Sequence, residues 1–406
     1  MPSSLAALAD DASSTTPSTA EATTPRPASR RDRPTTLYDL TPAQLEEQVT
    51  ALGEPAYRAA QVLNWTYDKR INSYGEMANI PASLRAKLTD TLPFATMVLE
   101  RDAVTDNGDT AKMLYRTFDG QYVETVLMLY RDRATVCVSC QVGCAVGCAF
   151  CATGIGGLMR NLTAGEMVQQ TVDAARRAGE LGRPLTNLVM MGMGEPLQNY
   201  ADTMRFIGII HDPRAMNFGA RRITISTSGI VPRIDALALE PYQVNLAVSL
   251  HAPNDELRSR LVPINRRYPV AELMAACDRY IAATGRRISF EYALMNGINN
   301  SDEIARELGR LLHGRLCHVN IIPFNPVEML DFERPDPAGI ERFAEILRSI
   351  GIPTTVRYSR GVEIAAACGQ LRAQHEREQT AVQTAVQTAV QTAVQASPVI
   401  PLAHVS

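Results

Sequence analysis

No apolar run in the sequence approaches the roughly 20 residues that a helix needs to cross a bilayer. The N-terminus has no basic segment followed by an apolar core, so we expect no signal peptide. Cysteine is scarce for a disulfide-stapled secreted scaffold, with eight in 406 residues. The net charge of −3 gives no sign of a nucleic-acid partner. These absences predict a cytoplasmic protein without membrane association, in which 46% hydrophobic residues can form a large core.

Both ends of the chain have compositions typical of disorder. Residues 1–36 are rich in Ser, Thr, Ala and Pro, and residues 376–406 contain repeats of QTAV. Few large apolar side chains are available there to offset the entropy cost of ordering. Between these tails we expect a helical accessory domain at residues 37–93 and a larger domain at residues 94–375.

Residues 37–93 carry signals of helix initiation. Thr41-Pro42 places an N-cap residue before a proline at the first helical position, and Ile80-Pro81-Ala82 opens another helix. The sole tryptophan, Trp65, is expected in the core of this domain, and stacking on a nucleobase is the alternative.

From residue 94 onward, strand patterns come first and then alternate with helical ones. Asp119-Gly120, between MLYRTF and YVETVLMLY, predicts a β-hairpin. Strand-like segments from ATVCVS to TTVRYS then alternate with helices, such as the one from Thr163 to Gly179. This alternation predicts parallel strands joined by right-handed crossovers. We therefore expect an α/β fold: a complete or partial (β/α) barrel with a small N-terminal helical domain and a β-hairpin extension.

The run CQVGCAVGCAFC contains the most informative spacing. Cys144, Cys148 and Cys151 are separated by three and then two residues, so one short loop brings three thiolates together. Three thiolates can hold three irons of a [4Fe–4S] cluster and leave the fourth iron open as a reaction site. A structural zinc site with Cys140 as the fourth ligand is the alternative. The CxxxCxxC spacing resembles the signature of the radical S-adenosylmethionine (SAM) enzymes.

Glycine and polar residues follow several predicted strands, where the functional groups of parallel barrels gather. In GMGEP at 192–196, Gly194 permits close backbone approach and Glu195 supplies a negative charge, although a strand-to-helix turn has the same composition. The other residues at strand ends are Ser226, Ser249, Leu250, His251 and Asn325. A simple loop hydrogen bond is the alternative for each of them.

The motifs together resemble those of one family. CVSCQVGCAVGCAFCATG, GMGEPLQN, STSGIVP, VSLHAP, IPFNP and AACGQL occur in this order. They closely resemble the motifs of the RlmN/Cfr family of radical SAM RNA methyltransferases, from about residue 37 to about residue 372. The departures are the two tails and Cys140, where the family usually has serine.

The resemblance implies roles for individual residues. The cluster ligands would be Cys144, Cys148 and Cys151, and the SAM contacts would be Gly194, Glu195, Ser226, Ser249, Leu250, His251 and Asn325. The catalytic residues would be Cys368 as methyl carrier, Cys137 as resolving thiol and Glu124 as proton acceptor. Without the family, both cysteines would be interpreted as buried core residues and Glu124 as an exposed strand carboxylate.

The resemblance also implies a reaction that uses two SAM molecules per turnover. One SAM would methylate Cys368, and a second would supply a 5′-deoxyadenosyl radical that activates this methyl group for transfer to C2 of adenosine. A transient Cys137–Cys368 disulfide would then release the RNA. The implied substrates are 23S rRNA, in its peptidyl transferase region, and tRNA, with residues 37–93 as an RNA-binding domain. The implied electron donor is a protein such as flavodoxin or ferredoxin, and we expect a monomer.

Two further interpretations stay open. The antibiotic-resistance (Cfr) type shares these cysteines but methylates C8 of adenosine, and the spacing of motifs does not reveal how adenine is oriented. A non-catalytic iron–sulfur or zinc RNA-binding module is the other.

Overall fold

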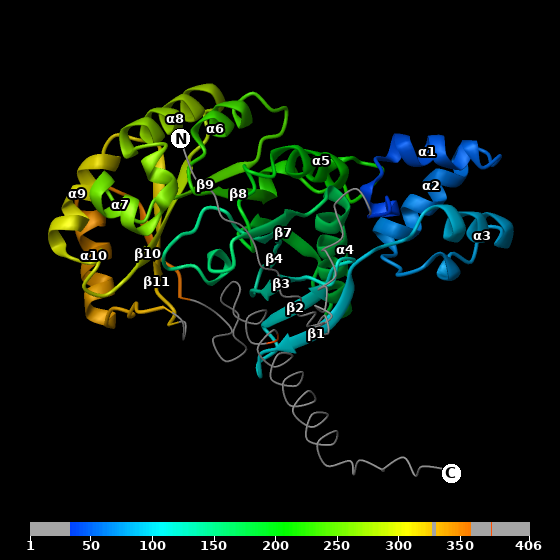
Figure 1. The fold of residues 1–406 in the computed structure, drawn as a ribbon, viewed down its shortest axis with the longest axis horizontal. Coiled ribbons are helices and arrows are strands. Elements are labelled where there is room, and N and C mark those ends of the chain that lie inside the picture. The colour runs from blue at the N-terminus through cyan, green and yellow to red at the C-terminus, as the bar shows by residue number, and fades with distance from the viewer. Residues whose placement is uncertain (1–32, 327–329, 359–374, 376–406) are drawn as a thin grey trace, which may run out of the picture. The chain divides into compact units, whose positions relative to one another are not determined.

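The computed structural model describes residues 33–326 and 330–358 together with His375 (Figure 1). Cys368, nearly all of the predicted N-terminal tail and the whole predicted C-terminal tail lie outside the described residues. No helix in the described part of the chain is both long enough and apolar enough to cross a membrane.

Residues 37–93 form the predicted helical region, with α1 (Pro42–Ala51), α2 (Tyr57–Leu63) and α3 (Ala82–Thr91). Thr41 caps α1, because its hydroxyl oxygen accepts a hydrogen bond from the Gln44 amide at 3.3 Å. Trp65 packs against the buried apolar cluster, and its indole N–H donates to the side chain of Asn79. These contacts favour the core interpretation of Trp65.

An antiparallel extension precedes the parallel strands. Strands β1 (Val98–Val104), β2 (Thr110–Arg116) and β3 (Tyr122–Leu129) pair in sequence order, and β3 pairs with β4 (Ala134–Cys137). The predicted hairpin joins β2 to β3, and Gly120 in its turn has a φ of 76°, which favours glycine.

Strand β4 begins the parallel part of the sheet. The strands that follow it in spatial order are β7 (Leu185–Met190), β8 (Ile223–Thr227), β9 (Asn245–Ser249), β10 (Ile288–Leu294), β11 (Cys317–Pro323) and β12 (Thr354–Val356). Each neighbouring pair from β4 to β12 is parallel. Within the described residues the sheet ends at β1 and β12, so the barrel is partial. The predicted fold class is confirmed.

The helices that connect the parallel strands lie on the outer side of the curved sheet (Figure 1). They are α4 (Ala164–Glu180), α5 (Tyr200–His211), α6 (Val231–Leu237), α8 (Val270–Thr284), α9 (Asp302–Leu312) and α10 (Pro337–Ser349). The short helix α7 (Asp255–Leu261), also between β9 and β10, packs instead against residues of the cysteine loop. Helix α4, the helix predicted from Thr163 onward, starts at a capping box, in which the Glu166 amide donates to the Thr163 hydroxyl and the Glu166 carboxylate accepts from the Thr163 amide.

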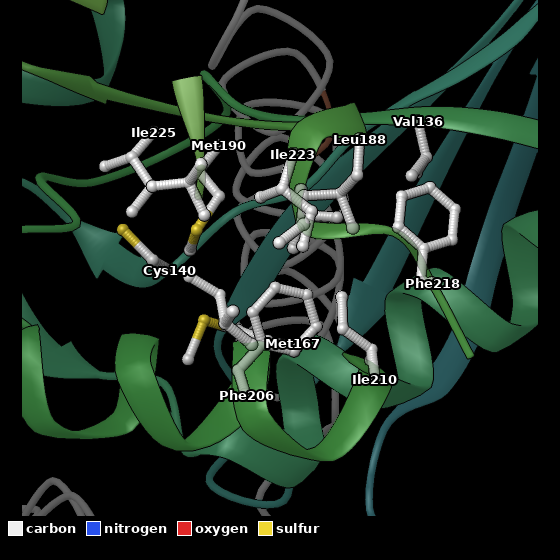
Figure 2. Close-up of a cluster of buried hydrophobic side chains, with 14 of the residues drawn as sticks. Val136, Cys140, Met167, Leu188, Met190, Phe206, Ile210, Phe218, Ile223 and Ile225 are labelled. Atoms are coloured by element: carbon white, nitrogen blue, oxygen red, sulfur yellow. The ribbon is translucent and has the colours of Figure 1, made fainter. Parts of the chain in front are cut away.

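Part of the core lies between β4, β7 and β8 and the helices that cover them (Figure 2). The side chains of Phe206 and Ile210 from α5 point toward those of Leu188 and Ile223 in the sheet. Full burial of side chains of this kind contributes about 1.5–3 kcal/mol each. Cys140, the fourth ligand of the zinc alternative, is only 2% exposed and belongs to this core.

Candidate active site

A cavity of about 360 Å³ lies at the carboxyl ends of the parallel strands. Its wall includes most of the predicted site residues: Cys144, Cys148, Cys151, Gly194, Glu195, Ser226, Ser249, His251 and Asn325. Parallel topology explains this gathering, because residues at the carboxyl ends of neighbouring strands meet at one edge. Leu250 is the exception: its side chain is fully buried in the core and its amide donates to the Glu291 carbonyl at 3.1 Å.

The cysteine loop is held between two short strands that the sequence analysis did not predict, β5 (Gln141–Gly143) and β6 (Leu158–Asn161). The Cys144 amide donates to the Gly157 carbonyl at 2.9 Å. Gly143 has a φ of 77°, and a Cβ added there would lie 1.9 Å from the same carbonyl oxygen. Glycine at this position therefore allows the two ends of the loop to approach each other.

The thiols of the loop influence one another's ionisation. Burial raises the pKa of Cys144 to about 11. Burial, followed by the charges of Cys151 and Cys144, raises the pKa of Cys148 well above its usual range. Cysteine must lose its proton to bind a metal, and iron would compensate the negative charge that burial disfavours.

The arrangement of donors fits a cluster better than a single ion. Among the residues that the structure describes, no group of three or more His, Cys, Asp or Glu is placed to hold one metal ion. In a [4Fe–4S] cluster each thiolate binds a different iron, so the three sulfurs need not converge on one point. Cys140, the fourth ligand of the zinc alternative, belongs to the core in Figure 2 and not to the cavity wall. The geometry therefore favours the cluster.

Gly192 and Gly194, which follow β7, allow close packing against the segment after β4. A Cβ at Gly192 would lie 2.7 Å from the Ser139 hydroxyl oxygen, and one at Gly194 would lie 2.6 Å from the Cβ of Gln141. Any side chain at either position would collide with neighbouring protein atoms, so packing within the protein alone explains why both residues are glycine. The resemblance implies that a cofactor approaches Gly194, and the glycine composition alone does not separate that cause from packing within the protein.

Glu195 is a buried carboxylate whose two oxygens are both hydrogen-bonded inside the protein. Its Oε2 accepts from the amide and the hydroxyl of Ser228 at 2.7 and 2.8 Å, and its Oε1 accepts from the Leu197 amide at 3.0 Å. Burial raises the pKa of Glu195, and the bonds from Ser228 and Leu197 oppose that rise. A cationic ligand group in the cavity would thus meet a carboxylate that is already fixed in position.

Arg258 of α7 connects the loops that follow β8 and β9. Its fully buried guanidinium donates to the carbonyl oxygens of Ser228, Ser249 and Leu250 at 2.6, 3.2 and 3.1 Å. Burial lowers the pKa of Arg258 to about 10, so the group stays cationic at neutral pH. These bonds hold the Ser249–His251 turn against the cavity.

His251 is a neutral hydrogen-bond donor in the cavity wall. Its Nδ1 accepts from the Ala293 amide at 2.9 Å, and its ring meets that of Phe150 edge-on, 4.6 Å between centroids. Because an amide N–H only donates, Nδ1 carries no proton and Nε2 carries the hydrogen. Burial, with the charge of Arg258, lowers the pKa of His251 to about 3. The ring therefore stays neutral across the physiological range.

This lowered pKa makes His251 a source of acid instability. Histidine in the unfolded chain has a pKa near 6.5. As the pH falls from about 6.5 toward 3, His251 is therefore protonated in the unfolded state but not in the folded state, and this difference favours unfolding. Lowering the pH from 8 to 5 should cost about 2 kcal/mol of folding free energy through this residue. In urea unfolding at the two pH values, His251→Asn should lack this part of the pH dependence. Equal pH dependence in both proteins would contradict the assignment.

The structure brings Glu124 and Cys137 together, and Cys137 pairs with Val189 of β7, whose last residue, Met190, lines the cavity. Val126 of β3 pairs with Cys137 of β4 on one side and with Lys112 of β2 on the other. The Nζ of Lys112 lies 2.9 Å from Oε2 of Glu124, and both side chains are buried. Glu124 is thus not the exposed carboxylate of the alternative interpretation. Cys137 is half-buried and burial raises its pKa to about 11, while the charges of Arg357 and Lys112 lower it.

One charged residue of the cavity wall, Glu291 of β10, is not among the site residues predicted from the sequence. The available signal is a single carboxylate within the otherwise apolar strand sequence ISFEYALM. A charged residue in a buried strand is uncommon unless it is paired.

A cysteine loop of this spacing, placed in a cavity at the strand ends of a partial (β/α) barrel, defines a radical SAM enzyme. The model of the Radical SAM superfamily matches residues 138–308. A second model, described as the ribosomal RNA large subunit methyltransferase N-terminal domain, matches residues 35–93. The superfamily implies a [4Fe–4S] cluster and SAM as cofactors.

Similar proteins identify the family within this class. A "Probable dual-specificity RNA methyltransferase RlmN" of Desulforamulus reducens is 46% identical over 340 residues, which are 84% of this chain and 96% of that protein. One of the same name from Chloroflexus aurantiacus is 48% identical over 351 residues, 84% of this chain and 93% of that protein. The crystal structure of a radical SAM methyltransferase from Sphaerobacter thermophilus, at 63% identity, covers 83% of this chain and 99% of that chain with a TM-score of 0.82. The chain belongs to the RlmN family, and it is a radical SAM methyltransferase.

Proposed function

We propose that this enzyme methylates C2 of adenosine in the peptidyl transferase region of 23S rRNA and in tRNA. The proposal rests on one observation: the cysteine loop shares a cavity with most of the predicted SAM contacts. The names of the similar RlmN proteins, which describe dual-specificity RNA methyltransferases, support an RNA substrate. The match of residues 35–93 to an N-terminal domain of rRNA methyltransferases supports an RNA-binding role for the helical region.

Cys144, Cys148 and Cys151 would hold the [4Fe–4S] cluster. Of the predicted SAM contacts, Gly194, Glu195, Ser226, Ser249, His251 and Asn325 line the cavity in which SAM would bind. When bound, cluster and SAM supply a 5′-deoxyadenosyl radical, which a carbon as electron-poor as C2 of adenine requires. The fixed carboxylate of Glu195 and the neutral imidazole of His251 would orient SAM. Two SAM molecules would be used per turnover, with an electron donor such as flavodoxin or ferredoxin.

Three protein residues would carry the methyl group through the reaction. Cys368, which lies outside the described residues, would accept the methyl group on its sulfur and carry it to C2. Glu124 would take the C2 proton, and Lys112 at 2.9 Å would hold its carboxylate in place. Cys137 would then attack the sulfur of Cys368, forming a disulfide and releasing the methylated RNA. The target adenosine would have to leave its stack to reach this site. We expect the enzyme to act as a monomer in the cytoplasm.

Mass spectrometry of RNA nucleosides tests the proposal. Deletion of the gene should remove 2-methyladenosine from 23S rRNA and tRNA, and the intact gene should restore it on re-expression. Loss of 8-methyladenosine instead would identify the C8-directed alternative. No change in either nucleoside would support a non-catalytic RNA-binding module and overturn the proposal.

A further inference from the structure

Glu291 on β10 has one carboxylate oxygen without a hydrogen-bond partner. The residue is 4% exposed, and it lines the same cavity as the cysteine loop. Its Oε1 accepts a hydrogen bond from the Asn320 amide group at 2.8 Å, whereas its Oε2 is buried and accepts none from the residues that the structure describes. Glu195, the other carboxylate of the wall, has both oxygens occupied. Of these two carboxylates, Glu291 is the one with an oxygen that accepts no hydrogen bond from the described residues.

The free oxygen is held in a fixed position. Asn320, which anchors Oε1, lies opposite Glu291 in the register of β10 and β11, and its own Oδ1 accepts from the Thr355 hydroxyl at 2.7 Å. On the other side, Glu291 pairs with Ser249 in the register of β9 and β10. The carboxylate is therefore prearranged by strands on both sides, at the level of a predicted SAM contact.

An unsatisfied buried acceptor is costly, typically about 1–3 kcal/mol, and more when it is charged. Burial raises the pKa of Glu291, while the Asn320 bond and the charge of Arg357 oppose this. Nη1 of Arg357 lies 3.9 Å from Oε2, which is too far for a hydrogen bond. A ligand that donates a hydrogen bond to Oε2 would remove the cost.

The surroundings select the kind of donor. Because a guanidinium already lies near Oε2, a second cation there would be repelled, so a neutral hydroxyl fits better than an ammonium group. Carboxylates recurrently bind ribose hydroxyls in nucleotide sites. An RNA ribose has a free 2′-hydroxyl only and would bring its phosphates toward this carboxylate. SAM has both ribose hydroxyls free and no phosphate.

We propose that Oε2 of Glu291 accepts a hydrogen bond from a ribose hydroxyl of SAM, which makes Glu291 a SAM-binding residue. This inference rests on the proposed use of the cavity for SAM. It adds a contact on β10 to those predicted after β7, β8, β9 and β11.

Glu291→Gln tests the contact in the reconstituted holoenzyme. Glutamine keeps an oxygen for Asn320 but places an NH₂ donor where Oε2 stood, so it cannot accept the hydroxyl. Equilibrium binding of SAM, measured without RNA, should weaken about 10- to 100-fold, as for the loss of a hydrogen bond to a charged group. Wild-type enzyme should also bind the 2′-deoxy or the 3′-deoxy analogue of SAM more weakly by a similar factor. The variant should not distinguish SAM from that analogue.

Measurements of iron content and circular dichroism check that the Glu291→Gln protein is folded and contains its cluster. The matched control is Ser289→Ala, because Ser289 lies on the same strand but outside the cavity wall. Wild-type enzyme that binds SAM and both deoxy analogues equally would overturn the inference without any mutant. Unchanged SAM affinity in Glu291→Gln, with weaker binding of RNA in gel shifts, would assign Oε2 to the RNA and overturn it as well. The methylated nucleoside is measured in a separate experiment, so an error in the proposed RNA product can be distinguished from an error in the proposed SAM contact.

Discussion

Replacement of Cys148 by alanine is expected to abolish iron binding and methyl transfer together. The variant would have two thiolates to hold a cluster that needs three. Burial and the neighbouring thiols already disfavour the ionised form of the cysteines in this loop. The reaction requires the cluster, so product formation should fall by more than about a thousandfold. Iron analysis and visible absorbance of anaerobically reconstituted protein measure the first effect. Release of 5′-deoxyadenosine under strong reductant measures the second.

Cys277→Ala is the matched control for this variant. Cys277 is a fully buried thiol in α8, and it packs in the core and does not line the cavity. Its replacement should lower stability slightly and leave iron content and product formation near the wild-type values. A Cys148→Ala protein that still holds about four irons per chain and cleaves SAM would show that the cysteine loop is not the cluster site.

The fold was predictable from the sequence wherever the signal was local. The capping box at Thr163 fixes the start of α4, Asp119-Gly120 fixes the hairpin, and the alternation of strands and helices fixes the parallel sheet. Strands β5 and β6 were not predictable, because they are short and pair across the whole cysteine loop. Their pairing depends on the close approach of Gly143 to Gly157, and the pattern of apolar residues along the sequence gives no sign of this contact.

The residues of the candidate site likewise fall into those that a local motif predicts and those that depend on partners distant in the sequence. The three cysteines form a local motif, and the structure places all three in one cavity, as the spacing predicts. The burial of Glu124 depends on Lys112 from a neighbouring strand, and the free oxygen of Glu291 depends on Asn320 from another. Such partners are distant in sequence, so only the fold shows which carboxylates are paired.

The Cys137→Ala variant is expected to stop after one round, with the RNA still attached to the protein. If Cys137 resolves the intermediate, its removal takes away the thiol that would attack the sulfur holding the RNA. A protein–RNA adduct should accumulate to about one per loaded enzyme, and multiple turnover should be lost. Denaturing gels with labelled RNA measure the adduct. Cys317→Ala, which removes a buried thiol of β11, should form none.

The pH dependence of the wild-type enzyme provides a second test of the same residue. Burial raises the pKa of Cys137 to about 11, so at neutral pH the thiol is protonated and only a small fraction is thiolate. In single-turnover experiments, decay of the adduct should therefore accelerate with rising pH, by up to about tenfold per unit below pH 11. The stalled adduct of Cys137→Ala should show no such acceleration. Decay that is independent of pH in the wild type, or free RNA as the only product of the variant, would exclude Cys137 as the resolving thiol.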